Sequence, residues 1–389
     1  MIPYGRQSID EDDVAAVVET LRSDFLTQGP AVERFEAALR AITGAAHAVA
    51  VNSATSALHL ACLALGLGPG KRLWTSPNTF VATANAARLC GADVAFVDVD
   101  PRTWNLDPDA LEAKLLDARR RGEPGPDVVA TVDFAGQPCR VEAIRRLAAE
   151  YGFRVLEDAS HAVGASWRGE PVGCGSHADV TVFSFHPVKI VTTGEGGAAL
   201  TADAALAERM RLLRTHGVTR DPALTTGADG PWCYAQVDLG LNYRMTDIQA
   251  ALGVSQLARL DAFLARRRRL AARYDAALEG LPLQRPWQDP DGASATHLYP
   301  VRLDVERFRG GRLAAYEALR ARGVGVQVHY IPVHTQPYYR ALGSRPGDCP
   351  VAEAYYAGAL SLPLYAGLSD AEQDRVIEAV HAVCRELAA

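Results

Sequence analysis

The chain lacks the features that mark several large classes of protein. It has no apolar run approaching about eighteen residues and no apolar stretch near its start, so we predict neither a membrane helix nor a signal peptide. Its seven cysteines are scattered and never spaced as C-x-x-C, which argues against a disulfide framework or a zinc site. The net charge is -6, which argues against a nucleic-acid surface. We therefore expect a cytoplasmic protein without a metal site.

Two glycine-rich segments also lack the nucleotide-binding patterns that they resemble. In "GLGPGKR", Leu65 stands where a phosphate loop needs its first glycine, and Arg72 stands where it needs serine or threonine. The segment "GEGG", residues 194–197, does not have the G-x-G-x-x-G spacing. Neither segment predicts a dinucleotide or nucleoside-triphosphate site.

What the chain does have is an alternation of β-rich runs with amphipathic helical patterns. Seven runs read as strands, at residues 47–52, 72–76, 93–99, 127–133, 153–158, 179–185 and 197–202. Nearly continuous apolar strands separated by helices are typical of a mostly parallel sheet covered on both faces. We predict an α/β fold in which residues 12–247 form a large domain, with a seven-stranded, mostly parallel sheet flanked by helices.

A second, smaller α+β domain is predicted for residues 248–389, with residues 1–11 packing against it. A long helical pattern over 246–280 leads into this part, which continues with strands at 297–303 and 323–330 and helices at 311–322 and 370–387. Four consecutive arginines, Arg266 to Arg269, would point all round the long helix. We interpret them as a solvated or salt-bridged face rather than a phosphate site.

Ligands of such a sheet bind beyond the carboxyl ends of its strands. After the first strand, Ser53, Ala54 and Thr55 begin a helix, whose free N–H groups suit a phosphate, although a simple N-cap explains the same residues. After the second strand comes Phe80, which suits stacking on a flat ligand or, alternatively, core packing.

Two charged residues follow other strands. Asp158 ends the strand "FRVLED", where a buried carboxylate needs a partner, and a cationic ring nitrogen would be one. Ser184 and then Lys189 follow "DVTVFSF". An amine beside an apolar wall loses proton affinity, as a Schiff-base nucleophile requires, although a loop lysine by itself is usually solvated.

Together these parts are those needed to hold pyridoxal phosphate. Lys189 would form the Schiff base, and Asp158 would keep the pyridine nitrogen protonated. Phe80 would cover one face of the ring, while Ser184 and the backbone of Ala54 and Thr55 would hold the phosphate.

With these residues named, the chain closely resembles the DegT/DnrJ/EryC1/StrS family of nucleotide-sugar aminotransferases, which have the fold of type I pyridoxal-phosphate enzymes, like aspartate aminotransferase. The motifs that carry the resemblance are "LTQGPAVERFEAAL", "NSATSALHLACLALGLGPG", "FVATANAA", "VDFAGQPC", "EDASHAVGA", "FSFHPVKIVTTGEGG" and "LGLNYRMTDIQAALG". Some relatives are dehydratases with a histidine in place of the lysine. Because Lys189 is present, the resemblance implies transamination.

The resemblance also implies a homodimer, in which Asn242 of the partner subunit reaches the cofactor phosphate, and a cofactor-binding role for His161. Within the family, "NSATSALHL", "VDFAG", "DASHA" and "QVHYIPV" look most like the pseudaminic acid branch. Those enzymes transfer the amino group of L-glutamate to C4 of a UDP-linked 4-keto-6-deoxy-N-acetylhexosamine. The candidate substrate-binding residues are Tyr4, Thr27, His186, Arg244, His297, Tyr299, His329 and Tyr330. Packing of the small domain is the alternative for His297, Tyr299, His329 and Tyr330, and an inter-subunit structural role is the alternative for Arg244.

Two other functions remain open from the sequence. The same scaffold aminates dTDP- or GDP-linked keto-sugars or an inositol ketone, and a non-catalytic regulator that binds a small ligand or DNA is the second possibility. The acidic charge balance and the absence of a recognisable helix-turn-helix argue against the regulator.

Overall fold

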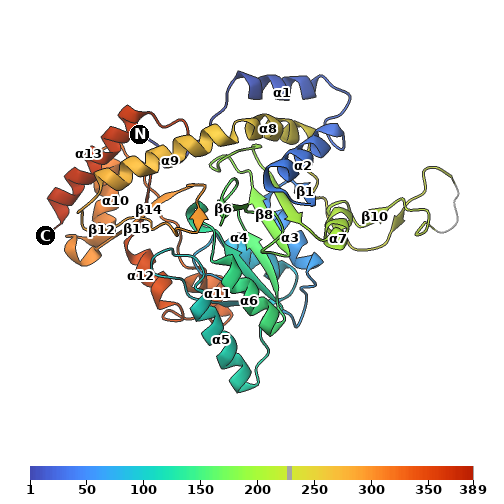
Figure 1. The fold of residues 1–389 in the computed structure, drawn as a ribbon, viewed down its shortest axis with the longest axis horizontal. Coiled ribbons are helices and arrows are strands. Elements are labelled where there is room, and N and C mark those ends of the chain that lie inside the picture. The colour runs from blue at the N-terminus through green and yellow to red at the C-terminus, as the bar shows by residue number, and fades with distance from the viewer. Residues whose placement is uncertain (226–229, 389) are drawn as a thin grey trace.

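A seven-stranded sheet forms the centre of the molecule in a computed structural model that describes residues 1–225 and 230–388 (Figure 1). The strand order is β1-β9-β8-β5-β4-β2-β3, and β9 runs antiparallel to both its neighbours while the other pairs are parallel. The strands are β1 (His47–Val51), β2 (Arg72–Thr75), β3 (Asp93–Phe96), β4 (Val128–Val132), β5 (Arg154–Asp158), β8 (Val180–Ser184) and β9 (Gly197–Thr201). The predicted seven-stranded, mostly parallel sheet is therefore confirmed.

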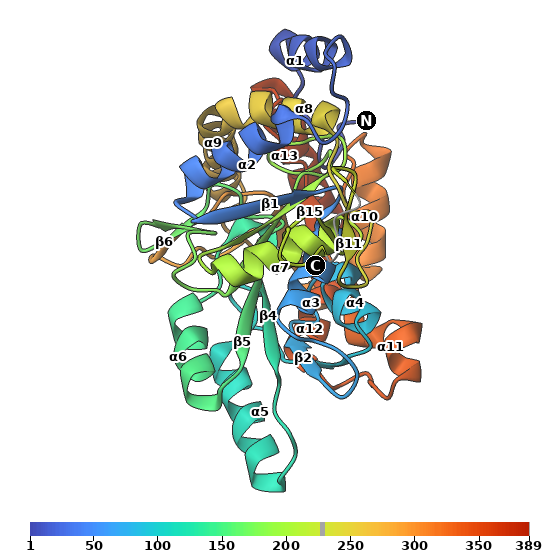
Figure 2. The same ribbon diagram turned by 90° about the vertical axis from the view of Figure 1, so that its right-hand side faces the viewer.

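Helices cover both faces of this sheet because its strands are apolar on both sides (Figure 2). One face packs against α2 (Pro30–Thr43), α5 (Pro108–Arg121), α6 (Val141–Tyr151) and α8 (Asp247–Ala258). The other face packs against α3 (Ala54–Ala64), α4 (Val81–Leu89) and α7 (Ala204–Arg214). Within each strand, alternate side chains enter these two cores, so successive residues of β5 face different helices.

The C-terminal part has its own antiparallel sheet and core. Its strands, in the order β12-β14-β15, are β12 (Leu283–Gln284), β14 (Tyr299–Leu303) and β15 (Ala359–Leu362). The helices of this part are α10 (Gly311–Ala321), α11 (Pro337–Ala341), α12 (Pro350–Gly358) and α13 (Asp370–Leu387). Ile2 lies in the core of this part and pairs with Val324. The domain boundary at residue 247 stays a prediction, and residue 389, the end of the predicted small domain, lies outside the described residues.

Two predicted elements of this region are wrong in detail. The expected strand at 323–330 makes only single bridges, at Val324 and Gln327, and the third strand is β15 instead. Beyond Gln327 the chain leaves the sheet, and its next residues line the cavity described below.

The expected helix over 246–280 is divided into α8 and α9 (Leu260–Ala277) at Arg259, whose side chain hydrogen-bonds to Asp13 of α1 (Glu11–Leu21). The break lets the first turns of α9 pack on the large sheet, whereas Leu270 and Tyr274 pack in the C-terminal core.

The four arginines of α9 also differ from the prediction. Arg268 and Arg269 are exposed and Arg266 pairs with Asp370, as a solvated or salt-bridged face requires. Arg267 is only 1% exposed and donates to the backbone oxygens of His297 (3.0 Å) and Leu364 (3.1 Å). It joins two loops of the C-terminal part, which no periodicity of the sequence could show.

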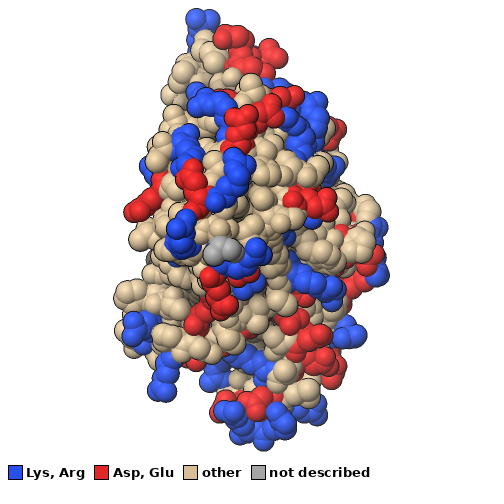
Figure 3. All heavy atoms as spheres, turned by 90° about the vertical axis from the view of Figure 1, so that its left-hand side faces the viewer, with Lys and Arg blue, Asp and Glu red and all other residues tan. Residues whose placement is uncertain are grey.

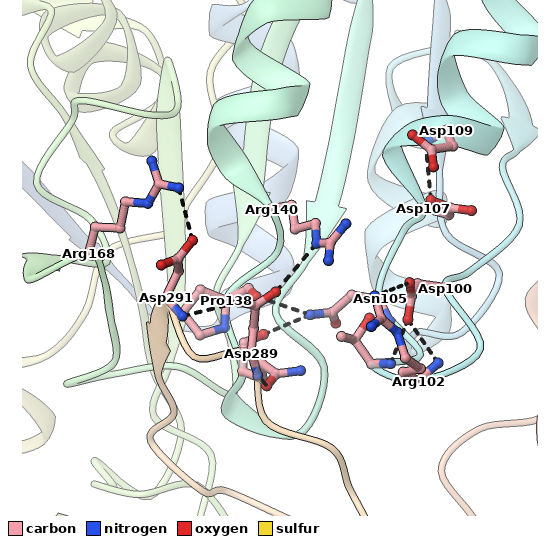
Figure 4. A network of polar contacts seen from close by, with 12 residues as sticks. Asp100, Arg102, Asn105, Asp107, Asp109, Pro138, Arg140, Arg168, Asp289 and Asp291 are labelled. Carbon is pink, nitrogen blue, oxygen red and sulfur yellow. Dashed lines mark hydrogen bonds and ion pairs between the residues drawn. The ribbon is translucent and has the colours of Figure 1, made fainter.

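Two small sheets complete the fold. The hairpin of β10 (Val218–Thr219) and β11 (Ala235–Gln236) projects from the body, as Figure 1 shows. The strands β6 (Ser166–Trp167), β7 (Glu170–Pro171) and β13 (Gly292–Ala293) form the other sheet. Two ion pairs hold the loop before β13 in place (Figure 4). Asp289 of this loop pairs with Arg140, the residue before α6, and Asp291 pairs with Arg168, between β6 and β7. On the face in Figure 3, acidic and basic side chains are interspersed.

Candidate active site

A cavity of about 560 Å³ lies beyond the carboxyl ends of β4, β5 and β8. Its size is in the range of small-molecule sites. The cavity brings together most of the residues singled out in the sequence: Tyr4, Ala54, Thr55, Phe80, Asp158, His161, Ser184, His186, Lys189, His297, His329 and Tyr330. They come from at least six segments that are far apart in the chain.

The first turn of α3 forms one wall of this cavity. Ser53 is the N-cap, and its side chain accepts a hydrogen bond from the backbone N–H of Ser56. The N–H groups of Ala54 and Thr55 precede the first intrahelical bond of α3, so they are available to an anion. Gly197 of β9 lies directly behind them, since a Cβ there would be 2.5 Å from the Ala54 nitrogen. Only glycine at the start of β9 leaves room for the first turn of α3 to lie this close to the strand.

Asp158 lies at the end of β5 and is held by neighbours on two sides. Thr83 of α4 donates its hydroxyl hydrogen to Oδ2 at 2.6 Å. The hydroxyl and the backbone N–H of Ser160 both approach Oδ1, at 2.5 and 3.1 Å. The carboxylate is 5% exposed and has a fixed orientation toward the cavity.

Lys189 reaches the same cavity from the loop between β8 and β9. Its backbone N–H donates to the carbonyl of His186 at 2.9 Å, in a turn that follows the buried Phe185. Burial lowers the pKa of the Lys189 ammonium to about 8, although the negative charge of Asp158 opposes the fall. About a tenth of the amine is therefore uncharged at pH 7, far more than for an exposed lysine, and this uncharged form is the one that acts as a nucleophile or takes up a proton.

Three histidines of the cavity are uncharged at neutral pH. Burial and the Lys189 ammonium lower the pKa of His161 and of His329, the latter to about 3. The pKa of His297 is likewise far below its usual value, chiefly through burial and the neighbouring His161, whose ring centre is 4.5 Å away. The Nδ1 atom of His297 is buried and has no hydrogen-bond partner among the described residues. It is free to bond to a ligand.

The tautomer of His161 determines whether the Tyr330 hydroxyl can donate its hydrogen to a ligand. The Nδ1 atom of His161 accepts from the Ala135 backbone N–H at 3.3 Å, so the proton of the neutral ring is on Nε2. Nε2 then donates to the Tyr330 hydroxyl, 3.2 Å away. Burial and the charge of Asp158 raise the pKa of Tyr330, so this phenol keeps its own hydrogen, which it can donate into the cavity.

The aromatic ring proposed for stacking is exposed at the side of the cavity. Phe80 caps the start of α4, is 61% exposed and lines the cavity, with Tyr330 6.3 Å away between ring centres. The core-packing alternative for Phe80 does not apply, because its ring is largely uncovered.

Four predicted site residues do not line the cavity. Thr27, Asn242 and Arg244 lie on extended segments at the edge beside β1. Tyr299 is 1% exposed in β14, and its hydroxyl donates to Asp275 at 2.6 Å. The prediction of a substrate contact for Tyr299 is corrected, because core packing already accounts for its ring and its hydroxyl.

Two residues that fix Asp158 were missed in the sequence. Ser160 had a signal, because a serine two residues after an aspartate commonly bonds to its carboxylate. Thr83 had none, since its contact joins residues 75 positions apart.

The described part of the chain contains no helix with both the length and the apolar content needed to cross a membrane.

Comparisons with known proteins agree with the geometry. The profile of the DegT/DnrJ/EryC1/StrS aminotransferase family matches residues 7–381. A spore coat polysaccharide biosynthesis protein of Bacillus subtilis, SpsC, is 41% identical over 99% of this chain and 97% of its own. The UDP-4-amino-4,6-dideoxy-N-acetyl-beta-L-altrosamine transaminase of Campylobacter jejuni is 39% identical over 94% of this chain and 93% of its own.

Solved structures are similar over almost the whole chain. PseC from Helicobacter pylori, an aminotransferase of pseudaminic acid biosynthesis, has a TM-score of 0.90 at 32% identity and covers 99% of each chain. The PMP form of Spr1654, a proposed sugar aminotransferase of Streptococcus pneumoniae, has a TM-score of 0.89 at 30% identity, with 99% of this chain and 100% of its own covered. The resemblance noted in the sequence is confirmed, and the chain belongs to the DegT/DnrJ/EryC1/StrS aminotransferase family.

Proposed function

We propose that the protein is a pyridoxal-phosphate-dependent aminotransferase that moves the amino group of L-glutamate to C4 of a UDP-linked 4-keto-6-deoxy-N-acetylhexosamine. The observation that carries the proposal is the convergence of Lys189, Asp158 and the first turn of α3 on one cavity. The names of the Campylobacter and Helicobacter relatives support the choice of substrate.

The residues present fit the cofactor. Gly197 lets the first turn of α3 lie against β9, and the Ala54 and Thr55 amides of that turn would hold the phosphate together with Ser184. Asp158, fixed by Thr83 and Ser160, presents a carboxylate to a cationic ring nitrogen.

The cofactor, when bound, supplies an electron sink for breaking the Cα–H bond of the amino acid. Lys189 would take that proton on Nζ as a general base and would then, as an acid, give it to C4′, the aldehyde carbon of the cofactor. Its depressed pKa supports this role, because the best proton carriers have pKa values near the working pH. Phe80 and His161 would cover the ring and exclude water.

Polar groups around the cavity suit a sugar and a carboxylate. The free Nδ1 of His297 and the phenol of Tyr330 would bond to ligand oxygens. Tyr4, His186 and His329 also line the cavity. The sites would be completed in a homodimer, with Asn242 of the partner subunit at the phosphate and Thr27 and Arg244 near the subunit boundary.

The decisive experiment supplies purified enzyme with L-glutamate and a panel of UDP-, dTDP- and GDP-linked keto-sugars and detects amino products by mass. We expect turnover of the UDP substrate with release of 2-oxoglutarate. Amination of only a dTDP or GDP sugar would refute the proposed substrate.

The reaction class is tested separately with a Lys189→Ala variant. We expect loss of turnover together with a changed absorbance of bound pyridoxal phosphate. Full turnover in this variant would refute the role of Lys189.

A further inference from the structure

Two carboxyl groups that the proposed reaction does not use are buried on the opposite face of the sheet from Asp158. Glu157 precedes Asp158 on β5, so its side chain faces α6 rather than the cavity. Asp133 follows the end of β4, the neighbouring strand. Asp133 is 0% exposed and Glu157 is 3% exposed, so both are withdrawn from water.

The register of the strands brings these two side chains together. Thr131 of β4 pairs with Glu157, and Asp133 lies two residues further on, hence on the same face as Thr131. The backbone N–H of Asp133 donates to the Asp158 carbonyl at 3.1 Å, which holds the end of β4 beside the end of β5. The two side chains thus lie on one buried face of adjacent strands, and a hydrogen bond with Asp133 lowers the pKa of Glu157 against the larger, opposite effect of burial.

The hydrogen bonds of three of the four carboxyl oxygens bear on whether the pair holds a proton. Asp133 Oδ1 accepts from the Cys139 backbone N–H at 3.0 Å, and Glu157 Oε2 accepts from the Thr181 hydroxyl at 2.8 Å. Asp133 Oδ2 is buried and accepts no hydrogen bond from any described residue. Two ionised carboxylates have no hydrogen to share, so a bond between them requires that one be protonated.

We propose that Asp133 and Glu157 form a carboxyl pair that shares one proton, and that the pair thereby keeps a single negative charge beneath Asp158. Two unshared charges at this place would repel the Asp158 carboxylate, which the proposed function needs in its ionised form. The pair is thus a positioning element for Asp158 and does not touch the substrate.

Other charged groups near the pair do not replace the proton. The negative charge of Asp158, on the other face of the sheet, disfavours a second negative charge here, whereas the hydrogen bonds from Cys139 to Asp133 stabilise one. His177 and Glu170 line the same small cavity as Glu157 and pair with each other at 2.9 Å. Burial raises the pKa of Asp133 far above its usual value and raises the pKa of Glu157 to about 7, in agreement with the geometry.

The first test is infrared spectroscopy of the holoenzyme at pH 7. We expect a carbonyl band of a protonated carboxylic acid that is absent in Asp133→Asn and in Glu157→Gln, because each amide can donate to the remaining carboxylate. The control is Glu170→Gln, which removes an exposed carboxylate near the same cavity and should keep the band. Absence of the band in the native enzyme, or its persistence in both single variants, would overturn the proposal.

The second test is the pH dependence of unfolding in denaturant. A carboxyl group with a raised pKa in the folded state binds its proton more tightly there, so stability decreases as the pH rises from the unfolded value of 4.5 toward about 7. We expect this decrease to be smaller in both single variants and unchanged in Glu170→Gln. Equal slopes in the native enzyme and both single variants would contradict the pair.

The third test concerns the link to the cofactor, which rests on the proposed function. Each single variant keeps one negative charge, whereas the double variant Asp133→Asn/Glu157→Gln keeps none. We expect the pH midpoint of the bound-cofactor absorbance to move to lower pH in the double variant only, because a cation near Asp158 loses a stabilising charge. An unchanged midpoint would overturn the electrostatic role, while the infrared band tests the shared proton independently of any cofactor.

Discussion

The pKa of Lys189 makes a quantitative prediction about stability. Without cofactor, burial lowers this pKa from 10.5 to about 8, so the folded protein binds the proton less tightly than the unfolded chain. The ammonium is therefore destabilising at neutral pH, and the penalty is lost as the pH rises through the interval from 8 to 10.5. Replacing Lys189 by Met, which has similar length and no charge, should stabilise the cofactor-free protein.

The size of the effect follows from the two pKa values. Linkage between protonation and folding gives a penalty of about 3.4 kcal/mol at pH 7, which decreases to about 1.4 kcal/mol at pH 9.5. These values are upper limits, because Lys189 lines an open cavity and keeps part of its surface in contact with solvent. We expect Lys189→Met to gain about 2–3 kcal/mol at pH 7.

The assay is denaturant unfolding of the cofactor-free proteins at pH 7 and pH 9.5, at one protein concentration. The chain has only three lysines, and Lys71 provides the control. The Lys71 side chain is 52% exposed and pairs with Asp127 at the surface, so Lys71→Met should lose no more than about 1 kcal/mol at either pH. A Lys189→Met protein no more stable than the native chain at pH 7, or equally stabilised at both pH values, would refute the reasoning.

Two further predictions concern close packing. Gly197→Ala places a methyl group 2.5 Å from the Ala54 nitrogen and should weaken cofactor binding at least about tenfold in a fluorescence titration. The control is Gly68→Ala, whose methyl group meets nothing within 4 Å, and we expect it to leave cofactor binding unchanged. Equal cofactor affinities of the two variants would contradict the role of the first turn of α3 in binding the phosphate. Arg267→Ala removes two hydrogen bonds from a buried site and should lower the free energy of unfolding by about 2–4 kcal/mol in denaturant. The exposed Arg269→Ala should change it by no more than about 0.5 kcal/mol, and a similar loss in both variants would show that burial of Arg267 is not the cause.

Much of the fold was predictable because its signals are local. Each of the seven strands is a short apolar run bounded by turns, and all seven were found within a few residues of their predicted bounds. Carboxyl ends of parallel strands meet at one edge of a sheet, so the sequence was enough to predict that Asp158 and Ser184 lie near each other. Lys189 follows Ser184 by five residues and could not be far away.

The interactions that orient and bury these side chains were not predictable, because they join segments that are far apart in the sequence. No periodicity shows that Thr83 bonds to Asp158, that Arg267 is buried beneath two loops, or that the helical pattern breaks at Arg259. Tyr299 was misassigned because an aromatic residue on a strand looks the same whether it faces a core or a cavity.

By itself, the sequence determined the sheet, the family and the lysine and carboxylate at its strand ends, since those follow from residue type and order. Only the tertiary structure decided their chemical state. The neutral histidines, the depressed pKa of Lys189 and the carboxyl pair of Asp133 and Glu157 all arise from burial among particular neighbours. The free energy of a charge depends on the surrounding dielectric and on the nearest dipoles, and these exist only once the chain is folded.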